Sequence, residues 1–213
     1  MTTADDAREN MRKTRRRRVV PIILAAGASR RMGFPKALLA LGEKSFVRHI
    51  IALYASVDCG KAVVVLGAHR KQVEEDIAGL DVSIVVNENY NAGQITSVIA
   101  GIDKGVTPGA DGILLHPVDH PLVSVDVVRK LLAAFDGTRG SIVLPKFEGR
   151  RGHPVIFSSA LFEELREAPL SVGARSVVWS HASEVVEVKT NDEGIVQNVD
   201  TPELYDRFCG RRG

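Results

Sequence analysis

The amino-acid sequence predicts an α/β protein built around a parallel sheet. Two segments, VVPIILA at residues 19–25 and AVVVL at residues 62–66, are continuous apolar runs, which are typical of strands buried on both faces. Between them, apolar residues from Phe46 to Tyr54 recur at helical spacing. A strand, a helix and a second strand in this order form a βαβ unit, whose two strands run parallel.

The elements follow one another from residue 19 onward. The first strand is expected at residues 19–25 and ends where glycine interrupts the apolar run. Ser45 is a suitable N-cap for the first helix, because its hydroxyl can accept a hydrogen bond from the first turn. Further helices are expected at 70–78, 96–104, 124–135, 160–166 and 174–181 and after Pro202, and further strands at 82–86, 112–116, 141–144 and 184–189. Residues 146–157, rich in Gly and Arg, predict a hairpin or an irregular insertion.

Length and composition favour a single domain. The 213 residues, of which 45% are hydrophobic and 25% charged, have the balance of an ordinary globular protein. We assign the domain to residues 19–213, preceded by a basic N-terminal tail at residues 1–18. This tail could contact nucleic acid, but a charged stretch before the first strand is more often a solvated, mobile segment, which is the interpretation we favour. No apolar run approaches the roughly 20 residues of a membrane span, so neither nucleic acid nor a membrane is predicted as a partner.

The cysteines indicate neither a disulfide framework nor a zinc site. Cys59 and Cys209 are isolated from each other and belong to no CxxC or Cys/His pattern. The N-terminal stretch also lacks the apolar segment of a secretory signal peptide. We therefore expect a cytoplasmic protein.

The loops after the strands are where function is expected. In an open α/β sheet, ligands bind beyond the carboxyl ends of the strands. The loops at residues 26–36, 67–69, 87–94 and 117–121 should therefore lie along one edge of the sheet.

Residues 24–36, LAAGASRRMGFPK, have the composition of a phosphate-binding loop. Gly27 and Gly33 allow backbone N–H groups to approach an anion, and Arg31 and Lys36 supply positive charge. The loop is not a Walker A loop, because Phe34 stands where that motif requires lysine, and it contains no GxGxxG. A simple glycine turn with surface arginines would explain either glycine alone, but the whole pattern favours a triphosphate site.

Two aspartates are candidate ligands of Mg²⁺. Asp119 follows the predicted strand ILLH between two prolines, where its carboxylate can be presented at the edge of the sheet. Asp200 precedes the last helix, so it is either the N-cap of that helix or a second carboxylate for the metal.

Other polar residues offer weaker indications. His120 is expected to line the substrate or to serve the structure, and His116 is expected in the core. Gly93 and Ser97 lie where a loop meets a helix and could hold part of a nucleotide, although capping by Thr96 explains part of this pattern. Gly152 and His153, after two arginines, could contribute to a pocket for an acceptor. The chain contains no GxSxG or HExxH motif, so phosphate chemistry remains the best-supported class.

Several of these segments together resemble one family, the nucleotidyltransferases that attach a nucleotide to molybdopterin. Residues 24–39, LAAGASRRMGFPKALL, are similar to the family signature LAAGxSxRMGxPKxLL, with Arg31 at the patterned arginine. The remaining similar segments, in family order, are NAGQITS at 91–97, PVDHP at 117–121, GHP at 152–154, GAR at 173–175 and VDTPE at 199–203. The resemblance spans residues 20–208.

This resemblance implies a Rossmann-like, three-layer αβα nucleotidyltransferase fold with a mostly parallel, mixed sheet, and a role for each matched residue. Arg31, Lys36 and Asp119 would be catalytic, and Asp119 would bind Mg²⁺ with Asp200. The nucleotide would be held by Leu24, Ala25, Ala26, Gly27, Lys36, Gly93 and Ser97, and the acceptor by His120, Gly152 and His153. The terminal phosphate of molybdopterin would attack the α-phosphate of the nucleotide in line and expel pyrophosphate. No general base is needed, because a phosphate nucleophile is already anionic at neutral pH.

The departures from the family pattern concern the acceptor more than the metal. Pro117 and His120 replace residues that are usual in the family beside the metal-binding aspartate. The choice of nucleotide is a separate point: Ala26, in LAAG rather than LAGG, favours CTP over GTP. Two alternatives remain: transfer to another phosphorylated acceptor such as a sugar phosphate, or a non-catalytic binder that delivers cofactor. A molybdenum hydroxylase would be the client of either a transferase or such a binder.

Overall fold

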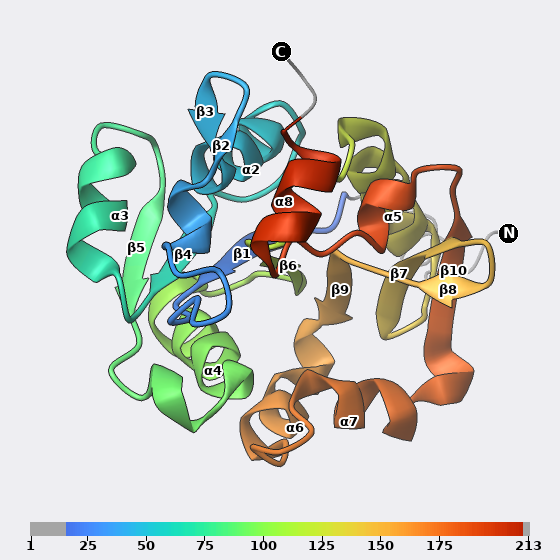
Figure 1. The fold of residues 1–213 in the computed structure, drawn as a ribbon. Coiled ribbons are helices and arrows are strands. Elements are labelled where there is room, and N and C mark those ends of the chain that lie inside the picture. Colours follow the sequence, from blue (N-terminus) through green and yellow to red (C-terminus); the bar gives the residue numbers. More distant parts are fainter. Residues whose placement is uncertain (1–15, 211–213) are drawn as a thin grey trace, which may run out of the picture.

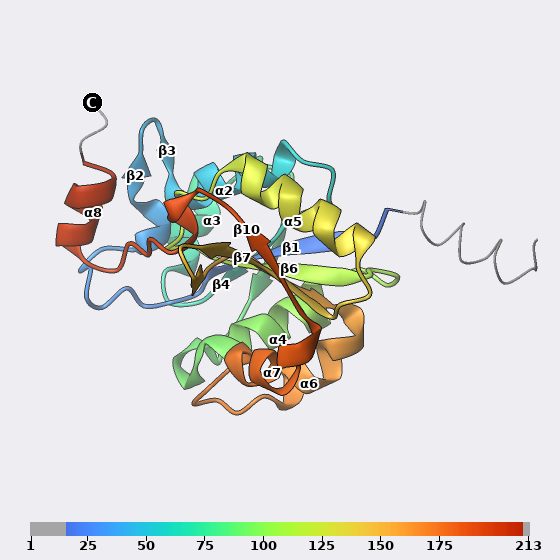
Figure 2. The ribbon, with the colours of Figure 1, turned by 90° about the vertical axis from the view of Figure 1, so that its right-hand side faces the viewer.

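The structure of the protein, a computed structural model, describes residues 16–210 and consists of a central sheet with helices on both faces (Figures 1 and 2). The predicted N-terminal tail falls largely on residues 1–15, which lie outside the described residues. Arg17 and Arg18, at its end, contact the body of the protein. The Arg17 guanidinium lies 3.3 Å from the centre of the Phe135 ring, and the Arg18 backbone N–H donates to the Asp111 carboxylate.

Within the described residues, eight strands form one mixed sheet. Their order is β10-β7-β9-β6-β1-β4-β5, with β8 paired to β7 beyond this path. The strands are β1 (Val19–Ala25), β4 (Val63–Leu66), β5 (Ser83–Val86), β6 (Gly112–Pro117), β7 (Ile142–Phe147), β8 (Arg150–Arg151), β9 (Val155–Ser158) and β10 (Val185–Lys189). Neighbouring strands among β6, β1, β4 and β5 are parallel, as are β7 and β10, whereas β9 is antiparallel to both β6 and β7. The predicted mostly parallel, mixed sheet is confirmed.

The helices form the two outer layers. One face of the sheet is covered by α2 (Phe46–Ala55), α3 (Arg70–Asp76) and α5 (Val125–Gly137), and the other by α4 (Gln94–Gly105), α6 (Phe162–Glu167) and α7 (Ala174–Ser180) (Figure 2). The last helix, α8 (Pro202–Phe208), lies beside the short hairpin β2 (Ala40–Leu41) and β3 (Lys44–Ser45) (Figure 1). The α/β class and the three layers expected from the sequence are therefore confirmed.

Both faces of β1 are buried, as its continuous apolar sequence predicts. Ile23 packs into the core cluster under α2 and α5, and Ile22 packs into the opposite cluster under α4, because side chains alternate along a strand. Both side chains are fully buried. Burial of a side chain of this size contributes roughly 1.5–3 kcal/mol to folding, so β1 anchors the loop that follows it.

Three local details differ from the sequence prediction. The β2–β3 hairpin, which turns at Gly42 with φ of 60°, was not predicted. Helix α4 begins at Gln94, and its N-cap is Gly93 rather than Thr96. Short 3-10 turns, also unpredicted, occur at η1 (Lys36–Leu38), η2 (Tyr90–Ala92), η3 (Ser159–Leu161), η4 (Ala182–Glu184) and η5 (Glu193–Ile195).

Candidate active site

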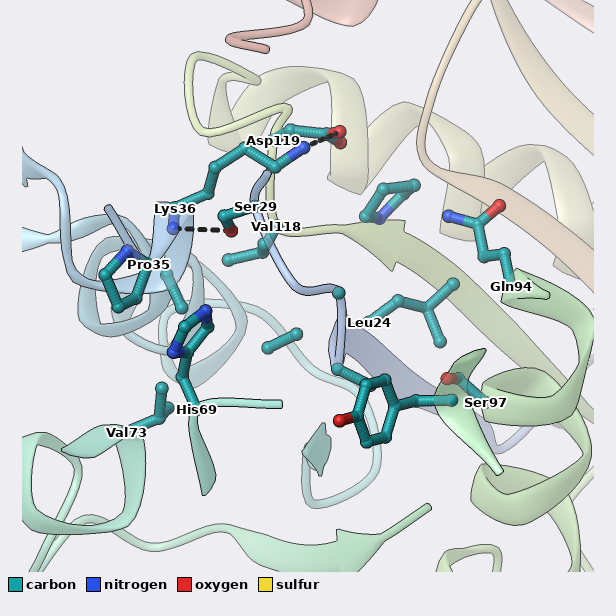
Figure 3. A pocket seen from close by; sticks show the side chains of 16 residues that line it. Leu24, Ser29, Pro35, Lys36, His69, Val73, Gln94, Ser97, Val118 and Asp119 are labelled. Carbon is teal, nitrogen blue, oxygen red and sulfur yellow. Dashed lines mark hydrogen bonds and ion pairs between the residues drawn. The ribbon is translucent and has the colours of Figure 1, made fainter. Parts of the chain in front are cut away.

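The four parallel strands β1, β4, β5 and β6 end at one edge of the sheet, and a pocket lies there. It is lined by residues from each of the four loops that the sequence predicts at this edge (Figure 3). The lining residues are Leu24, Ala25, Ala26, Gly27, Ser29, Pro35, Lys36, Ala37, His69, Val73, Tyr90, Gln94, Ser97, Pro117, Val118 and Asp119. Pocket and predicted edge thus coincide.

The loop after β1 has a defined shape. Ser29 adopts φ of 50°, and its carbonyl accepts hydrogen bonds from the backbone N–H groups of Met32 and Gly33. The Ser29 hydroxyl accepts a further hydrogen bond, 2.9 Å long, from the backbone N–H of Lys36. Space is open around Gly27, where an added Cβ would meet nothing within 4 Å. The loop is therefore closed on itself at Ser29 and open toward solvent at Gly27, where a ligand can approach the backbone.

A second hollow adjoins the pocket and shares Gly27, Ser29, Lys36 and Tyr90 with it. It is lined by Gly27, Ala28, Ser29, Arg30, Arg31, Lys36, Tyr90, Asn91 and Asp200. Two guanidinium groups, one ammonium group and the Asp200 carboxylate therefore border a single concave surface, in which positive charge is in excess. Such a surface attracts an extended polyanion.

Lys36 joins the two predicted metal ligands. Its Nζ lies 2.8 Å from Asp119 Oδ2 and 2.7 Å from Asp200 Oδ1, and Arg31 Nη2 lies 2.9 Å from Asp200 Oδ2. The backbone also connects the two aspartates, because the Val199 N–H donates to the Asp119 carbonyl at 2.7 Å. Asp119, Asp200, Lys36 and Arg31 thus converge as the sequence predicts.

Asp200 does not cap the last helix. The N-cap of α8 is Thr201, whose hydroxyl accepts a hydrogen bond from the Leu204 N–H. The capping alternative for Asp200 is therefore wrong, and its carboxylate is available to the cations of the site. Thr201 takes the cap because its side chain comes one residue closer to the helix.

The positive charge on Lys36 is stabilised by its two carboxylate neighbours. Burial alone would lower the pKa of the ammonium group, but the charges of Asp119 and Asp200 and their hydrogen bonds raise it above its ordinary value. The two carboxylates therefore meet on one cation, and their oxygen atoms are donors that suit a hard divalent ion. Among residues 16–210, no group of three or more His, Cys, Asp or Glu side chains is arranged to hold a metal. Two carboxylates would suffice only for an ion that shares its coordination with phosphate and water, as Mg²⁺ does.

Buried hydrogen bonds hold the turn that presents Asp119. His116 at the end of β6 is fully buried, its Nδ1 lies 2.7 Å from the Tyr54 hydroxyl, and its Nε2 lies 2.9 Å from the His120 carbonyl. Since a carbonyl only accepts, Nε2 carries the proton and Nδ1 accepts from Tyr54. Burial lowers the pKa of His116 to about 3, so this tautomer is neutral. The predicted core position of His116 is confirmed.

The residues predicted to bind an acceptor lie behind this turn. The rings of His120 and His153 are 4.7 Å apart, and the Nδ1 atom of each is buried without a hydrogen-bond partner among the described residues. Burial and the neighbouring His153 lower the pKa of His120 to about 3. Burial also lowers the pKa of His153. Gly152 packs against the backbone of Ile195. None of the three lines either hollow, and their role toward an acceptor stays a prediction.

Six of the seven predicted nucleotide-binding residues line the pocket: Leu24, Ala25, Ala26, Gly27, Lys36 and Ser97. Ser97 projects into it from α4 (Figure 3). Gly93 does not line it. Glycine is required there because the backbone has φ of 135° and an added Cβ would lie 3.1 Å from the Leu170 carbonyl oxygen.

Several residues of the pocket were not predicted. Ser29, His69 and Tyr90 belong to loops that the sequence places at this edge, but their residue types gave no indication of a role. Tyr90 lies over Gly67, where an added Cβ would be 2.8 Å from the Tyr90 ring. An aromatic residue within a loop already assigned to the edge of the sheet was the indication that could have identified it.

Comparison with protein families and with solved structures gives consistent results. The MobA-like NTP transferase domain family matches residues 21–185. The purine catabolism protein PucB of Bacillus subtilis is 31% identical, covering 88% of this chain and 94% of its own length. The nicotine blue oxidoreductase of Paenarthrobacter nicotinovorans is 30% identical over 89% and 96% of the two chains, and a molybdenum cofactor guanylyltransferase of Cereibacter sphaeroides is 28% identical over 87% and 93%. The crystal structure of Rv0371c from Mycobacterium tuberculosis superposes with a TM-score of 0.81 at 26% identity, over 92% of this chain and 100% of that one. Among the described residues, no helix has the length and apolar character to cross a membrane.

Proposed function

The chain belongs to the MobA-like NTP transferase family, and we propose that it is a Mg²⁺-dependent enzyme that transfers CMP from CTP to the phosphate of molybdopterin. The observation that carries this proposal is the convergence of Lys36, Asp119 and Asp200 at the mouth of a pocket lined by the loop after β1. The preference for CTP over GTP rests on Ala26 in the LAAG segment.

The reaction needs positioning and neutralisation of charge more than proton transfer. An oxygen of the acceptor phosphate forms a bond to the α-phosphorus while the bond from that phosphorus to the bridging oxygen breaks, and pyrophosphate leaves with the bonding electrons. The nucleophile is already anionic at neutral pH, so no protein base is required. Arg31 and Lys36 would stabilise the negative charge that accumulates on the leaving group.

The site fits a hard divalent cation. Both carboxylates already converge on one positive charge, the Lys36 ammonium, and all their donor atoms are oxygen. Asp119 and Asp200 are the residues that would hold the ion, which would supply Lewis-acid stabilisation of phosphate oxygens. Lys36 and Arg31 would then bind the β- and γ-phosphates, because both side chains also border the second hollow.

The acceptor is assigned with the help of the relatives. A relative named molybdenum cofactor guanylyltransferase supports a molybdopterin acceptor. A molybdenum hydroxylase would be the client of the product. Transfer to a different phosphorylated acceptor, such as a sugar phosphate, is the competing assignment.

The test is a pyrophosphate-release assay with each of the four NTPs, Mg²⁺ and either molybdopterin or a sugar 1-phosphate. We expect release with CTP and molybdopterin and little with the other combinations. Failure of every NTP to release pyrophosphate with molybdopterin would refute the proposal, and turnover of the sugar phosphate alone would assign the competing acceptor.

A variant pair separates an enzyme from a cofactor-delivering binder. Asp119→Asn should reduce turnover by orders of magnitude while the protein stays folded, because the carboxylate charge is lost at the reacting phosphates. The matched control is Asp126→Asn on α5, whose carboxylate pairs with Lys130 at the surface. If D119N still supports maturation of a client at the wild-type level, the protein is a binder.

A further inference from the structure

A buried amide, Asn87, lies between the end of β5 and the start of α4. The residue is 5% exposed, and its Nδ2 lies 2.8 Å from Thr96 Oγ1 and 2.9 Å from Ser97 Oγ. Its Oδ1 accepts a hydrogen bond of 2.9 Å from the backbone N–H of Asn89. The side chain therefore connects the loop after β5 to two hydroxyl groups of α4.

The backbone of Asn89 fixes the orientation of this amide. An N–H group can be accepted only by the oxygen of the Asn87 side chain, so Oδ1 must face Asn89 and the NH₂ group must face the helix. Both hydrogens of the NH₂ group are then donated, one to Thr96 and one to Ser97. Each hydroxyl oxygen is an acceptor toward Asn87.

The hydroxyl protons of Thr96 and Ser97 differ in their hydrogen-bond acceptors. Thr96 Oγ1 donates to backbone carbonyls, with the Gly93 oxygen at 2.8 Å and the Asn89 oxygen at 3.1 Å. Ser97 Oγ accepts from Asn87 but has no acceptor for its own proton among the described residues. The proton of Ser97 is thus left for a group outside the protein.

Ser97 presents this proton inside the pocket. The residue is 4% exposed and lines the pocket, which it enters from α4 (Figure 3). Lys36 and Asp119 lie on the opposite side of the same pocket (Figure 3). A nucleotide whose phosphates lie at Lys36 would bring its base, rather than its phosphates, to Ser97.

We infer that Asn87 is a positioning residue that commits the Ser97 hydroxyl to donate a hydrogen bond to the base of the bound nucleoside triphosphate. The inference rests on the proposed function, which supplies the ligand. Nucleobases carry carbonyl oxygens and unprotonated ring nitrogens that accept such a bond. Because the hydroxyl is already oriented in the free protein, little rotational freedom is lost on binding.

The decisive variant is Asn87→Asp, which keeps the shape of the side chain and reverses its hydrogen-bonding role. A carboxylate only accepts, so the Ser97 hydroxyl must turn its proton toward it and away from the ligand. Ser97→Ala removes the donor directly. Calorimetric Kd values for CTP and GTP with Mg²⁺ should rise roughly threefold to tenfold in each variant, as expected for one hydrogen bond. The double variant N87D/S97A should bind no more weakly than either single variant.

Two controls separate this effect from a general disturbance. Inorganic tripolyphosphate has no base, so its Kd should be the same in the wild type and in all three variants. Asn89→Asp adds the same charge to the same exposed loop without contacting Ser97, and its Kd for nucleotide should stay at the wild-type value. Additive losses in the double variant, or parallel weakening of tripolyphosphate, would overturn the inference.

The outcomes distinguish this inference from the proposed function. Absence of nucleotide binding by the wild type would overturn both, whereas wild-type binding that N87D leaves unchanged would overturn the inference alone. Thermal unfolding would check that N87D folds. Should it not fold, Asn87→Ala takes its place: Ser97 then keeps its proton but rotates freely, so the Kd should lie between those of the wild type and S97A. A Kd equal to that of the wild type would contradict the positioning role.

Discussion

Lys36 occupies the position where the charges of the site meet. Its ammonium group is mostly buried and lies within 2.8 Å of both Asp119 and Asp200. The same side chain borders the pocket and the adjoining hollow, so under the proposed function it would exchange carboxylate partners for phosphate partners without leaving the site. The cost of burying this charge is offset only while an anion is present on one side or the other.

Replacement of Lys36 should therefore weaken the binding of phosphate strongly. In Lys36→Met, two neighbouring carboxylates lose their shared cation and the triphosphate loses a charged donor. We expect the Kd for tripolyphosphate to rise roughly tenfold to a hundredfold, the range for hydrogen bonds to charged groups. Calorimetric titration measures it, with Lys44→Met on β3 as the control of equal charge change. Equal losses in both variants would mean that only net charge matters.

Tyr54 and His116 stabilise the turn before Asp119 from inside the core. In Tyr54→Phe, the buried Nδ1 of His116 loses its donor, which costs about 1–3 kcal/mol of unfolding free energy. Urea unfolding measures the loss. The control is Tyr205→Phe, whose hydroxyl donates to the Ala40 carbonyl in an exposed setting, where water replaces the bond. A Tyr205→Phe variant as destabilised as Tyr54→Phe would contradict this account.

The sequence predicts the positions of some site residues but not the contacts that they make. Asp119, Asp200, Arg31 and Lys36 lie in contact. The sequence indicates their proximity because each follows a strand or belongs to a family segment, and their roles toward a ligand stay predictions. The contact of Lys36 with Asp200 spans 164 residues, and that of Tyr54 with His116 spans 62. Periodicity and local motifs carry no information about which side chains meet across such separations, so the tautomer of His116 could be known only from the structure.

At the level of elements, the segment after β8 depends on one close approach. An added Cβ at Gly152 would lie 2.3 Å from the Ile195 carbonyl oxygen, which belongs to the backbone and cannot turn away. We expect Gly152→Ala to reduce the unfolding free energy by about 2 kcal/mol or more. In Gly137→Ala at the end of α5, the added Cβ meets nothing within 4 Å, and stability should stay level or rise slightly. Thermal unfolding of the pair checks both, and a stable Gly152→Ala variant would disprove the close contact.

His181 links α6 to η4 by contacts with two carboxylates. Its ring nitrogens lie 2.8 Å from Glu184 Oε1 and 2.8 Å from Glu164 Oε2. Hydrogen bonds to Glu184 and Glu164 raise the pKa of His181 above its ordinary value of 6.5. A raised pKa stabilises the folded state fully below pH 6.5, and this contribution disappears as the pH rises through the folded pKa.

A pH comparison tests this contact. His181→Gln should unfold at a lower temperature than the wild type at pH 6, and the difference should shrink at pH 9. The effect should be small, because the Glu164 and Glu184 side chains are each 45% exposed and water screens the charges. A difference in unfolding temperature that stays constant from pH 6 to pH 9 would show that charge plays no part.

Helices and strands with a long sequence pattern were predicted correctly. Prediction failed for elements whose pairing depends on the tertiary structure. Strands β1 and β4 and helix α2 follow from continuous apolar runs, helical spacing and the Ser45 cap, which the structure confirms. The antiparallel insertion of β9 between β6 and β7 could not be derived, because a hairpin sequence does not state which neighbours it pairs with. The two-residue strands β2 and β3 are too short to produce a periodic pattern.

At the level of the whole molecule, the parallel strands explain why four distant loops form one pocket. Strands β6, β1, β4 and β5 share a direction, so every loop that leaves a carboxyl end reaches the same edge. The sequence predicted this arrangement correctly from the alternation of strands and helices. The depth of the pocket and the identity of its lining residues could not be predicted, because both depend on how far the loops fold back over the strands.

The same burial that fixes the turn makes the whole fold sensitive to acid. His116 is neutral and fully buried, and burial lowers its pKa to about 3, whereas in the unfolded chain it protonates near 6.5. Below pH 6.5, His116 therefore binds a proton in the unfolded state but stays unprotonated in the folded state. Unfolding free energy should fall by about 1.4 kcal/mol per pH unit on this account, from pH 6.5 downward until the folded pKa is reached.

Between pH 6.5 and 5, His120 and His153, whose pKa values burial also lowers, add declines of the same sign, so only comparison with a variant that lacks His116 isolates its contribution. The contribution of His181 is complete below pH 6.5 and ordinary carboxylates protonate below pH 5, so these groups change little inside the interval, and the declines from His120 and His153 are common to the wild type and the variant. Urea unfolding at pH 6.5, 5.8 and 5.0 should give a steeper decline for the wild type than for His116→Gln, whatever the absolute stability of the variant. Parallel declines would mean that His116 is protonated in the folded state, which would require its Nδ1 to stop accepting from Tyr54 and would undo the tautomer on which the Asp119 turn depends.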